Sequence, residues 1–314
     1  MKVFITGICG FIGTNLAIHL QDAGFRVLGM DNAISKQNYE ELNQRGIDVR
    51  IGCITILRDL MQNIEPETEA VIHLAAKTEA RTPYAASGMM MRTNLLGTYN
   101  VAKAALAKRV GKLLFASSGA VYGHKESKCH PYLSRCKPSN VYGWTKLAGE
   151  NLIELARYEQ DSRPYESYNL RIANVYGPWS AKKGSVVAVV MRHAKNNVPF
   201  TIHGNGRQRR DFIYVGDVCE SIERCLLENG LRPGTYNIAT GRSISINELL
   251  RTMAEIVDLP EPIYDSAADY GVLAVSYETS GLNRLPPGRL LKDGLEETWQ
   301  WAKHHLGMSS SKTQ

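Results

Sequence analysis

Short apolar runs alternate with amphipathic stretches along the first half of the chain. Residues 2–6 form a compact β-branched and aromatic run, and Phe11, Leu16 and Leu20 follow at the spacing of one helix face. The same alternation predicts strands at residues 2–6, 26–30, 47–51, 69–74, 111–116 and 165–171. It predicts helices at residues 11–23, 37–45, 57–64, 88–109, 141–160 and 215–229. This order is typical of an α/β fold in which a doubly wound parallel sheet lies between two layers of helices.

A glycine-rich turn joins the first predicted strand to the first predicted helix. Gly7 permits the tight turn, Gly10 lets the backbone approach a pyrophosphate, and Gly13 lets the helix pack closely on the strand. The helix N-terminus directs free N–H groups toward the phosphates. Asp31 ends the next strand, where a carboxylate accepts hydrogen bonds from the adenosine ribose and repels a 2′-phosphate. The strand–turn–helix context predicts a Rossmann-type domain that binds NAD, although Lys36 leaves NADP open.

The regular alternation ends near residue 172. Gly-Pro, Asn-Gly and Pro-Pro pairs interrupt the rest of the chain at 177–178, 205–206 and 286–287. We therefore expect an NAD-binding Rossmann domain over residues 1–171, with a returning segment near 211–238. Residues 172–314 are expected to form a smaller C-terminal substrate-binding lobe that closes over the carboxyl ends of the strands.

Composition narrows the class of protein. The net charge of +6 is too small to indicate nucleic-acid binding. The six cysteines show neither a CxxC pair nor a disulfide spacing, which favours the cytoplasm. No signal peptide and no apolar run of 18 residues is present, so we expect no membrane partner. Residues 124–136 contain two histidines and two cysteines at spacings that match no common zinc site, so we expect no metal.

A candidate proton-transfer group follows the fifth predicted strand. Tyr142 and Lys146 are four residues apart in a helix that Pro138 and Ser139 are expected to start, so their side chains share one face. The phenol of a tyrosine has an ordinary pKa of about 10, and the neighbouring ammonium of Lys146 is expected to lower the pKa of Tyr142. Lys146 can also hold the nicotinamide ribose, and Ser118 can form a hydrogen bond with the substrate oxygen. The pattern favours oxidation of a secondary alcohol with a nicotinamide cofactor.

The chain resembles the extended short-chain dehydrogenases/reductases, in the UDP-glucose 4-epimerase-like branch of the nucleotide-sugar epimerases and dehydratases. The resemblance covers nearly the whole chain and rests on GICGFIG (7–13), DN (31–32), HLAA (73–76), NLLGTYNV (94–101), SSGAVYG (117–123), YGWTKLAGE (142–150), RIANVYGPW (171–179) and GNGRQRRDFIYVGDV (204–218). It implies that Ser118, Tyr142 and Lys146 are catalytic and that the protein is a homodimer, formed through helices 88–109 and 141–160, that acts in carbohydrate biosynthesis.

The resemblance also implies the binding residues. The implied cofactor-binding residues are Gly7, Gly10, Phe11, Ile12, Gly13, Asp31, Asn32, Leu74, Ala75, Ala76, Asn94, Tyr142 and Lys146. Asn94 stands where the family positions the catalytic lysine through water. The implied substrate-binding residues are Thr78, Arg81, Ser118, Asn174, His203 and Arg210. Of these, Asn174 and Arg210 contact the diphosphate and His203 lies against the base. Arg81 either reads a sugar carboxylate or braces a loop.

Three departures from the family pattern carry information. Gly119 and Ala120 stand where dehydratases have an acid, which disfavours dehydration. Cys53 replaces the usual aspartate that contacts adenine, and Asp59 is interpreted as a helix-start residue. The late arginine that grips the diphosphate is missing, with Ser266–Asp269 near its place; Lys182, Lys183 and Arg192 are candidates to compensate.

Together these features predict an NAD-dependent epimerase (an isomerase) of a nucleotide-diphosphate sugar, acting at C4 of a UDP-hexose through a 4-keto intermediate. A reductase or dehydratase of a nucleotide sugar is the alternative. A non-catalytic NAD sensor is disfavoured, because a sensor needs none of Ser118, Tyr142 and Lys146. The sequence leaves open the nucleotide, the sugar and the carbon.

Overall fold

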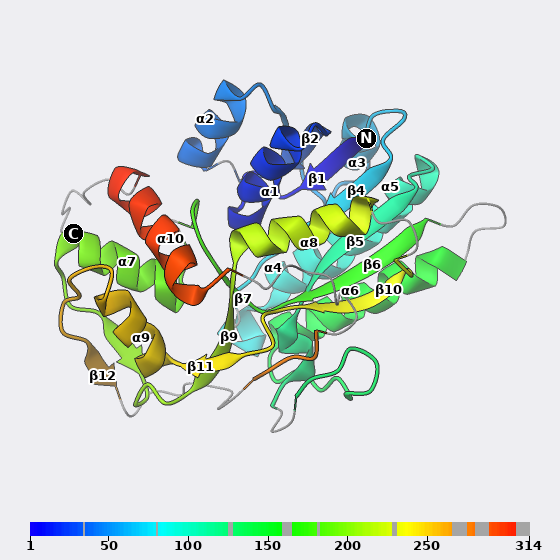
Figure 1. Ribbon diagram of the computed structural model, residues 1–314. Coiled ribbons are helices and arrows are strands. Elements are labelled where there is room, and N and C mark those ends of the chain that lie inside the picture. The colour runs from blue at the N-terminus through cyan, green and yellow to red at the C-terminus, as the bar shows by residue number, and fades with distance from the viewer. Residues whose placement is uncertain are drawn as a thin grey trace.

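A seven-stranded sheet forms the centre of the molecule (Figure 1). The computed structural model describes residues 1–33, 35–79, 81–124, 128–158, 165–180, 183–227, 231–265, 275–279 and 289–305. The strands lie in the order β10-β6-β5-β4-β1-β2-β3, and every neighbouring pair is parallel. Their bounds are β1 Lys2–Thr6, β2 Arg26–Asp31, β3 Asp48–Ile51, β4 Ala70–His73, β5 Lys112–Ser118, β6 Glu166–Ile172 and β10 Gly234–Ile238.

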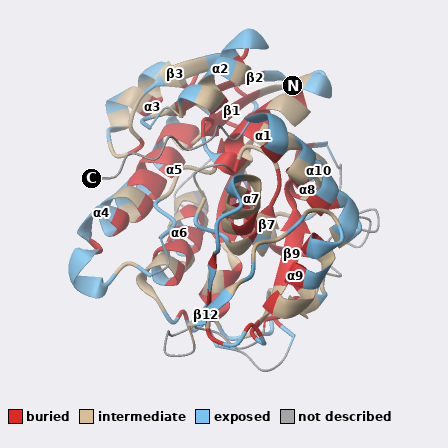
Figure 2. Cartoon of the chain, turned by 90° about the vertical axis from the view of Figure 1, so that its left-hand side faces the viewer, coloured by how far each residue is buried: buried red, intermediate tan, exposed pale blue. Residues whose placement is uncertain are grey.

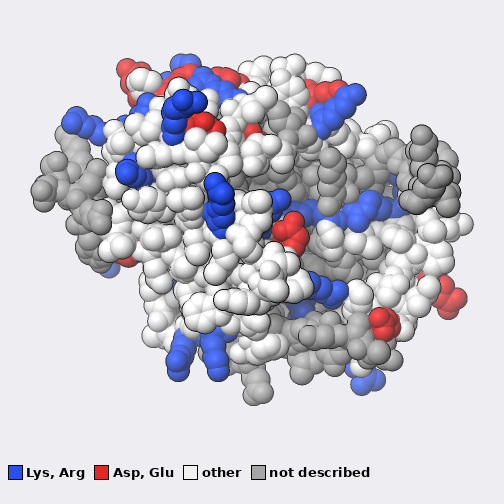
Figure 3. Space-filling model, turned by 180° about the vertical axis from the view of Figure 1, so that it is seen from behind, with Lys and Arg blue, Asp and Glu red and all other residues white. Residues whose placement is uncertain are grey.

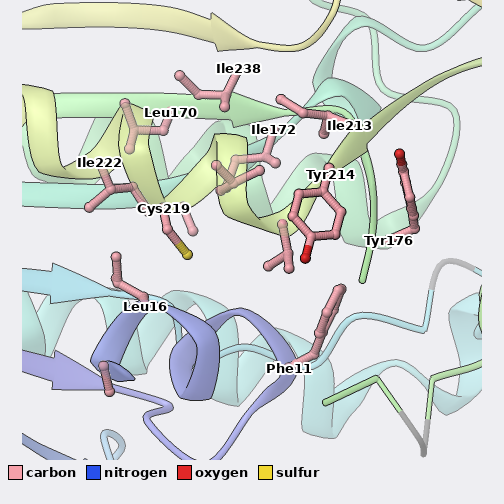
Figure 4. Close-up of a cluster of buried hydrophobic side chains, with 14 of the residues drawn as sticks. Phe11, Leu16, Leu170, Ile172, Tyr176, Ile213, Tyr214, Cys219, Ile222 and Ile238 are labelled. Carbon is pink, nitrogen blue, oxygen red and sulfur yellow. The ribbon is translucent and has the colours of Figure 1, made fainter. Parts of the chain in front are cut away.

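Helices cover both faces of this sheet. Successive side chains of a strand point to opposite faces, and β1 shows the result, because Val3 and Ile5 join one apolar cluster while Phe4 joins another. The first cluster lies under α1 (Phe11–Asp22) and α8 (Val215–Leu227), where Leu16 and Cys219 face the strands (Figure 4). The second lies under α3 (Leu57–Asn63), α5 (Gly97–Ala107) and α6 (Val141–Tyr158). The predicted Rossmann-type α/β fold is confirmed.

The chain after β6 builds two small sheets beside the large one. β7 (Asn174–Tyr176), β9 (Arg209–Tyr214) and β11 (Ser243–Ser245) form one, and β8 (Thr201–His203) and β12 (Ile263–Asp265) form the other. The remaining helices of this part are α7 (Val186–Asn196), α9 (Ile246–Ala254) and α10 (Leu291–His305). Between the small strands, α8 packs on α1 and β10 pairs with β6, so this stretch returns to the large sheet. The division of the chain at residue 171 stays a prediction.

The predicted element bounds agree with the structure within about two residues, with one exception. The helix predicted over 88–109 consists of α4 (Gly88–Met91), a π-helical turn η2 (Arg92–Leu96) and α5. Such turns are frequent at functional sites. The other elements are α2 (Lys36–Gln44) and the two 3₁₀ turns η1 (Tyr84–Ala86) and η3 (Gly119–Tyr122).

Buried residues follow the strands and the inner helix faces, whereas exposed residues gather on the outer helix faces (Figure 2). Among the residues that the structure describes, no helix has both the length and the apolar character needed to cross a bilayer. The same part of the chain contains no group of three or more His, Cys, Asp or Glu side chains placed to hold a metal ion.

Candidate active site

One large cavity lies at the carboxyl ends of the central strands. Its volume is about 1600 Å³, and residues from both the large sheet and the small sheets line it. The lining includes all but one of the residues expected to bind cofactor or substrate: Gly7, Gly10, Phe11, Ile12, Gly13, Asp31, Asn32, Leu74, Ala75, Ala76, Thr78, Arg81, Ser118, Tyr142, Lys146, Asn174, His203 and Arg210. The exception is Asn94. The fold thus brings together segments that are far apart in the sequence.

The glycine-rich turn forms one wall of the cavity. Gly7 has a φ of +75°, which favours glycine, and a Cβ there would lie 2.8 Å from the Ala75 backbone. A Cβ on Gly13 would lie 2.1 Å from the Gly7 carbonyl oxygen. The turn therefore presents bare backbone at the N-terminus of α1, which fits a pyrophosphate. Asp31 closes the far side of the turn, since its Oδ2 accepts a hydrogen bond from the Cys9 N–H at 3.0 Å.

Cys53 lines the cavity near this turn, where the family usually has an aspartate. Its backbone N–H donates to Asp59 Oδ2 at 2.8 Å, and Asp59 lies in the first turn of α3. Asp59 therefore braces the Cys53 loop from the helix start, as the sequence suggested.

Ser118, Tyr142 and Lys146 meet where β5 ends against α6. Tyr142 and Ser118 share a side-chain hydrogen bond. Lys146 Nζ donates to the Ala116 carbonyl oxygen at 2.7 Å and lies 5.9 Å from the centre of the Tyr142 ring. The helix begins at Val141, and Asn140 caps it by accepting a hydrogen bond from the Gly143 N–H at 2.8 Å. The cap is thus one residue later than the predicted Pro138–Ser139 start.

The protonation of this group differs from the sequence expectation. Burial raises the pKa of Tyr142 to about 12, and the hydrogen bond with Ser118 only partly offsets the rise. Burial and the charge of Lys183 lower the pKa of Lys146 to about 7, while Glu150 acts in the opposite direction. The expected lowering of the Tyr142 pKa is therefore not seen in this state, because loss of hydration outweighs the hydrogen bond with Ser118.

Asn94 lies behind the cavity wall rather than in it. Its side chain donates to the Lys77 carbonyl oxygen and to Thr145 Oγ1, both at 2.9 Å, and it accepts from the Lys77 N–H at 2.8 Å. Asn94 therefore joins the turn after β4 to α6, one residue from Lys146. Its expected role toward the lysine stays a prediction.

A buried ion pair between Glu150 and Arg171 lies next to the reacting groups. Glu150 accepts two hydrogen bonds from the Arg171 guanidinium, at 2.9 and 2.7 Å, and both side chains are only 6% exposed. Ser117 Oγ also donates to Glu150. Arg171 donates to Tyr122 Oη at 3.1 Å. The pair ties α6 to the ends of β5 and β6, next to Ser118. Glu150 could have been found from the sequence, because it lies four residues after Lys146 on the same helix face.

The space beside Ser118 is filled by a residue that the sequence analysis missed. A Cβ at Gly119 would lie 2.0 Å from Tyr277 Oη, and Tyr277 is 3% exposed. Of the two positions where dehydratases have an acid, Gly119 therefore has no room for a side chain unless Tyr277 moves. Nothing near position 119 in the sequence indicates Tyr277, because it arrives from a distant segment.

The expected substrate-binding residues lie on two sides of the cavity. Asn174 and Arg210 come from the neighbouring strands β7 and β9, and burial lowers the pKa of Arg210. His203 ends β8, and its carbonyl oxygen accepts from Gln208 Nε2 at 2.8 Å. Thr78 and the exposed Arg81 follow β4 on the opposite side.

Of the residues expected to compensate for the missing arginine, only Lys183 is described as part of the wall. Arg192 donates to the Lys183 carbonyl oxygen at 2.8 Å, and its side chain is not in the lining. Lys182 and Ser266–Asp269 lie outside the described residues.

The two tryptophans near the site differ. Trp179 packs against Trp301 and His305, with ring centres 5.6 and 5.2 Å apart, as expected of a packing residue. Trp144, by contrast, is 56% exposed on α6. Its neighbour on the helix, Gly143, packs inward against Ala120, which turns Trp144 toward solvent.

Known proteins match this chain along nearly its whole length. The profile of the NAD-dependent epimerase/dehydratase family matches residues 3–239. A Methanocaldococcus jannaschii protein named "Putative UDP-glucose 4-epimerase" is 30% identical over 316 residues, which cover 96% of this chain and 99% of the relative.

Similar solved structures include two with UDP-glucose bound. The UDP-glucose 4-epimerase of Thermotoga maritima with UDP-glucose is 26% identical, with a TM-score of 0.87 and coverage of 98% of this chain and 100% of the other. MoeE5 with UDP-glucose and NAD is also 26% identical, with a TM-score of 0.86 and the same coverage. MoeE5 was also solved with UDP-glucuronic acid and NAD.

Proposed function

The chain belongs to the NAD-dependent epimerase/dehydratase family and uses NAD, and from this premise we propose that it epimerises a UDP-hexose at C4. The observation that carries the proposal is the meeting of Ser118, Tyr142 and Lys146 in a cavity that extends from the glycine-rich turn to Arg210. When bound, NAD would supply reversible hydride transfer at C4, so the reaction would consume no net oxidant.

Tyr142 moves the proton of the C4 hydroxyl in this mechanism. The Lys146 ammonium favours the phenolate, the form that removes the proton as the 4-keto sugar forms. Burial favours the neutral phenol, the form that returns the proton when hydride comes back to the other face. Ser118 holds the sugar oxygen beside the phenol through the same hydroxyl that contacts Tyr142.

The remaining walls position the two nucleotides. Asp31 is proposed to bind the adenosine ribose of NAD, and the turn over Gly7 to Gly13 its pyrophosphate. Arg210 and Asn174 are proposed to bind the substrate diphosphate, where a guanidinium can form two hydrogen bonds. The absence of an acid at Gly119 and Ala120 argues against a dehydratase, and Tyr277 occupies the space beside Gly119.

The decisive experiment incubates the protein with UDP-, GDP- and dTDP-sugars and follows C4 configuration by NMR together with absorbance of NADH. We expect inversion at C4 of a UDP-hexose without net NADH. Tyr142→Phe should lower kcat by at least about 10³-fold with NAD affinity retained, because it removes the proton carrier and leaves the cofactor walls in place. Net NADH consumption would contradict the epimerase and indicate a reductase. A nearly active Tyr142→Phe would contradict the mechanism.

A homodimer and a cytoplasmic role in carbohydrate biosynthesis also stay proposals. The first has support from exposed apolar side chains on α4, η2, α5 and α6.

A further inference from the structure

We propose that Lys183 forms an anion subsite beside the reacting carbon, and that the preferred substrate is a UDP-hexuronate, whose sugar carries a carboxylate at C6. The inference rests on the proposed epimerase function and deepens it. A hexose and its uronate differ only in a neutral hydroxymethyl or an anionic carboxylate at that carbon, so one well-placed cation can distinguish them.

The backbone of Lys183 is held at both of its polar atoms. Its N–H donates to the Ser180 carbonyl oxygen, and its carbonyl oxygen accepts from Arg192, both at 2.8 Å. Ser180 is itself fixed, because its hydroxyl donates to the Gly177 carbonyl oxygen at 2.7 Å. The lysine therefore projects from a built turn after β7 and lines the cavity.

The side chain crosses from the small-sheet side of the cavity to the end of the large sheet. Lys183 Nζ donates to Thr78 Oγ1 at 3.5 Å, a long hydrogen bond that leaves the ammonium with donors to spare. Thr78 follows β4, next to the strand that carries Ser118. Lys183 is also close enough to Lys146 for its charge to lower the pKa of Lys146. These contacts place the ammonium at the sugar end of the cavity.

Asn174 on β7 and Arg210 on β9, the residues proposed for the diphosphate, lie on neighbouring strands, where Asn174 is paired with Phe212. The diphosphate thus has its own cation, and Lys183 is left for a second negative group. The charges that line the cavity also favour a ligand with a second negative group. Its lining contains six basic residues, Lys77, Arg81, Arg92, Lys146, Lys183 and Arg210, against only Asp31 and Glu79.

Asp31 is engaged by the glycine-rich turn, and Glu79 is exposed, although it favours the charged form of Lys183. The face of the molecule drawn in Figure 3 is hollowed near its middle, with Lys and Arg side chains in and beside the hollow. A half-buried ammonium loses hydration that a carboxylate at hydrogen-bond distance would replace.

The test compares kcat/KM for UDP-glucuronate and UDP-glucose, with C4 inversion followed by NMR. The wild type should prefer UDP-glucuronate. Lys183→Met should lower the ratio of the two kcat/KM values by about 10- to 100-fold, the usual effect of losing a charged hydrogen bond. Lys183→Arg should keep most of the preference. Lys303→Met, which removes an exposed lysine on α10, is the matched control and should leave the ratio as it is.

Three results would overturn the subsite. The first is equal kcat/KM for both sugars in the wild type, and the second is a ratio that Lys183→Met does not change. The third is a loss of affinity for UDP alone that equals the loss for UDP-glucuronate, which would assign Lys183 to the diphosphate. If the wild type inverts neither sugar, the proposed function fails. Calorimetric affinities of both UDP-sugars for wild type and Lys183→Met then still decide the subsite.

Discussion

The buried side chain of His73, at the end of β4, is held by hydrogen bonds at both ring nitrogens. Thr98 Oγ1 donates to the Asn94 carbonyl oxygen at 2.6 Å, so its oxygen accepts the Nε2–H of His73 at 3.0 Å. His73 Nδ1 then accepts from Thr6 Oγ1 at 2.7 Å. These bonds define the neutral Nε2–H tautomer. Burial, together with the charge of Lys146, lowers the pKa of His73 to about 3.

This pKa predicts a loss of stability in acid. The unfolded chain binds a proton at His73 below its ordinary pKa of about 6.5, and the folded chain does so only near 3. The stability that neutral His73 contributes is fully present above pH 6.5, and it declines as the pH falls toward 3. We expect His73 to contribute a loss of about 2 kcal/mol in free energy of unfolding between pH 7 and pH 5.

Chemical denaturation at the two pH values measures the loss. His73→Asn should show a smaller pH dependence than the wild type, whereas His304→Asn on exposed α10 should match the wild type. NMR titration of the imidazole provides a direct check that does not require the variant to fold. Protonation of His73 at pH 6 would contradict the prediction.

Residues such as Asp31, Tyr142 and Lys146 could be predicted from sequence because each lies within a local pattern of strand, turn or helix. Their protonation could not, since it depends on burial and on Lys183, which arrives from another part of the chain. Tyr277 is the clearest case, because its contact with Gly119 joins two distant segments.

Helix α6 carries the reacting groups and also the buried acid that supports them. Glu150→Gln would leave Arg171 buried without its counter-charge, so we expect a loss of about 3–5 kcal/mol in free energy of unfolding. Because Glu150 raises the pKa of Lys146, the same change should move the limb of the pH–kcat profile that reports Lys146 to lower pH.

The pH profile separates a positioning role from a merely structural one. Replacing both partners, with Glu150→Met and Arg171→Met, should recover much of the stability while the shifted profile remains. Glu150→Asp should restore the profile in part, and Glu296→Gln on the exposed side of α10 serves as control. An unshifted profile in Glu150→Gln would show that the ion pair acts on the fold alone.

At the level of elements, the sequence predicted six of the seven strands of the large sheet, with the helices that cover them, because their apolar spacing is long and regular. The edge strand β10 was missed, although the segment containing it was expected to return to the large sheet. The π-helical turn at η2 escaped prediction, since it accompanies the tertiary bonds of Asn94 to Lys77 and Thr145. The small sheets escaped for a different reason. Strands of three residues, such as β7, β8 and β11, are too short to show a period.

At the scale of the whole molecule, the surface formed by α4, η2, α5 and α6 carries several exposed apolar side chains. Met89 on α4, Leu96 on η2, Tyr99 on α5, and Trp144 and Leu155 on α6 are each 41–65% exposed. Their elements pack side by side, since α6 contacts α4, η2 and α5. Exposed apolar side chains on neighbouring elements favour an interface, and a second copy of the chain would bury Trp144, which the single chain leaves in solvent.

This argument predicts a dimer that a charge at its centre disrupts. Trp144→Glu should shift the mass measured by analytical ultracentrifugation from two chains to one, because a buried unpaired carboxylate is costly. Ile263→Glu, which charges an equally exposed side chain on β12 (57%), should leave the mass unchanged. A wild type that is monomeric at micromolar concentration would refute the interface. A Trp144→Glu variant that remains dimeric would place the interface elsewhere. Since Trp144 lies two residues from Tyr142, dissociation should also lower kcat by loosening the start of α6.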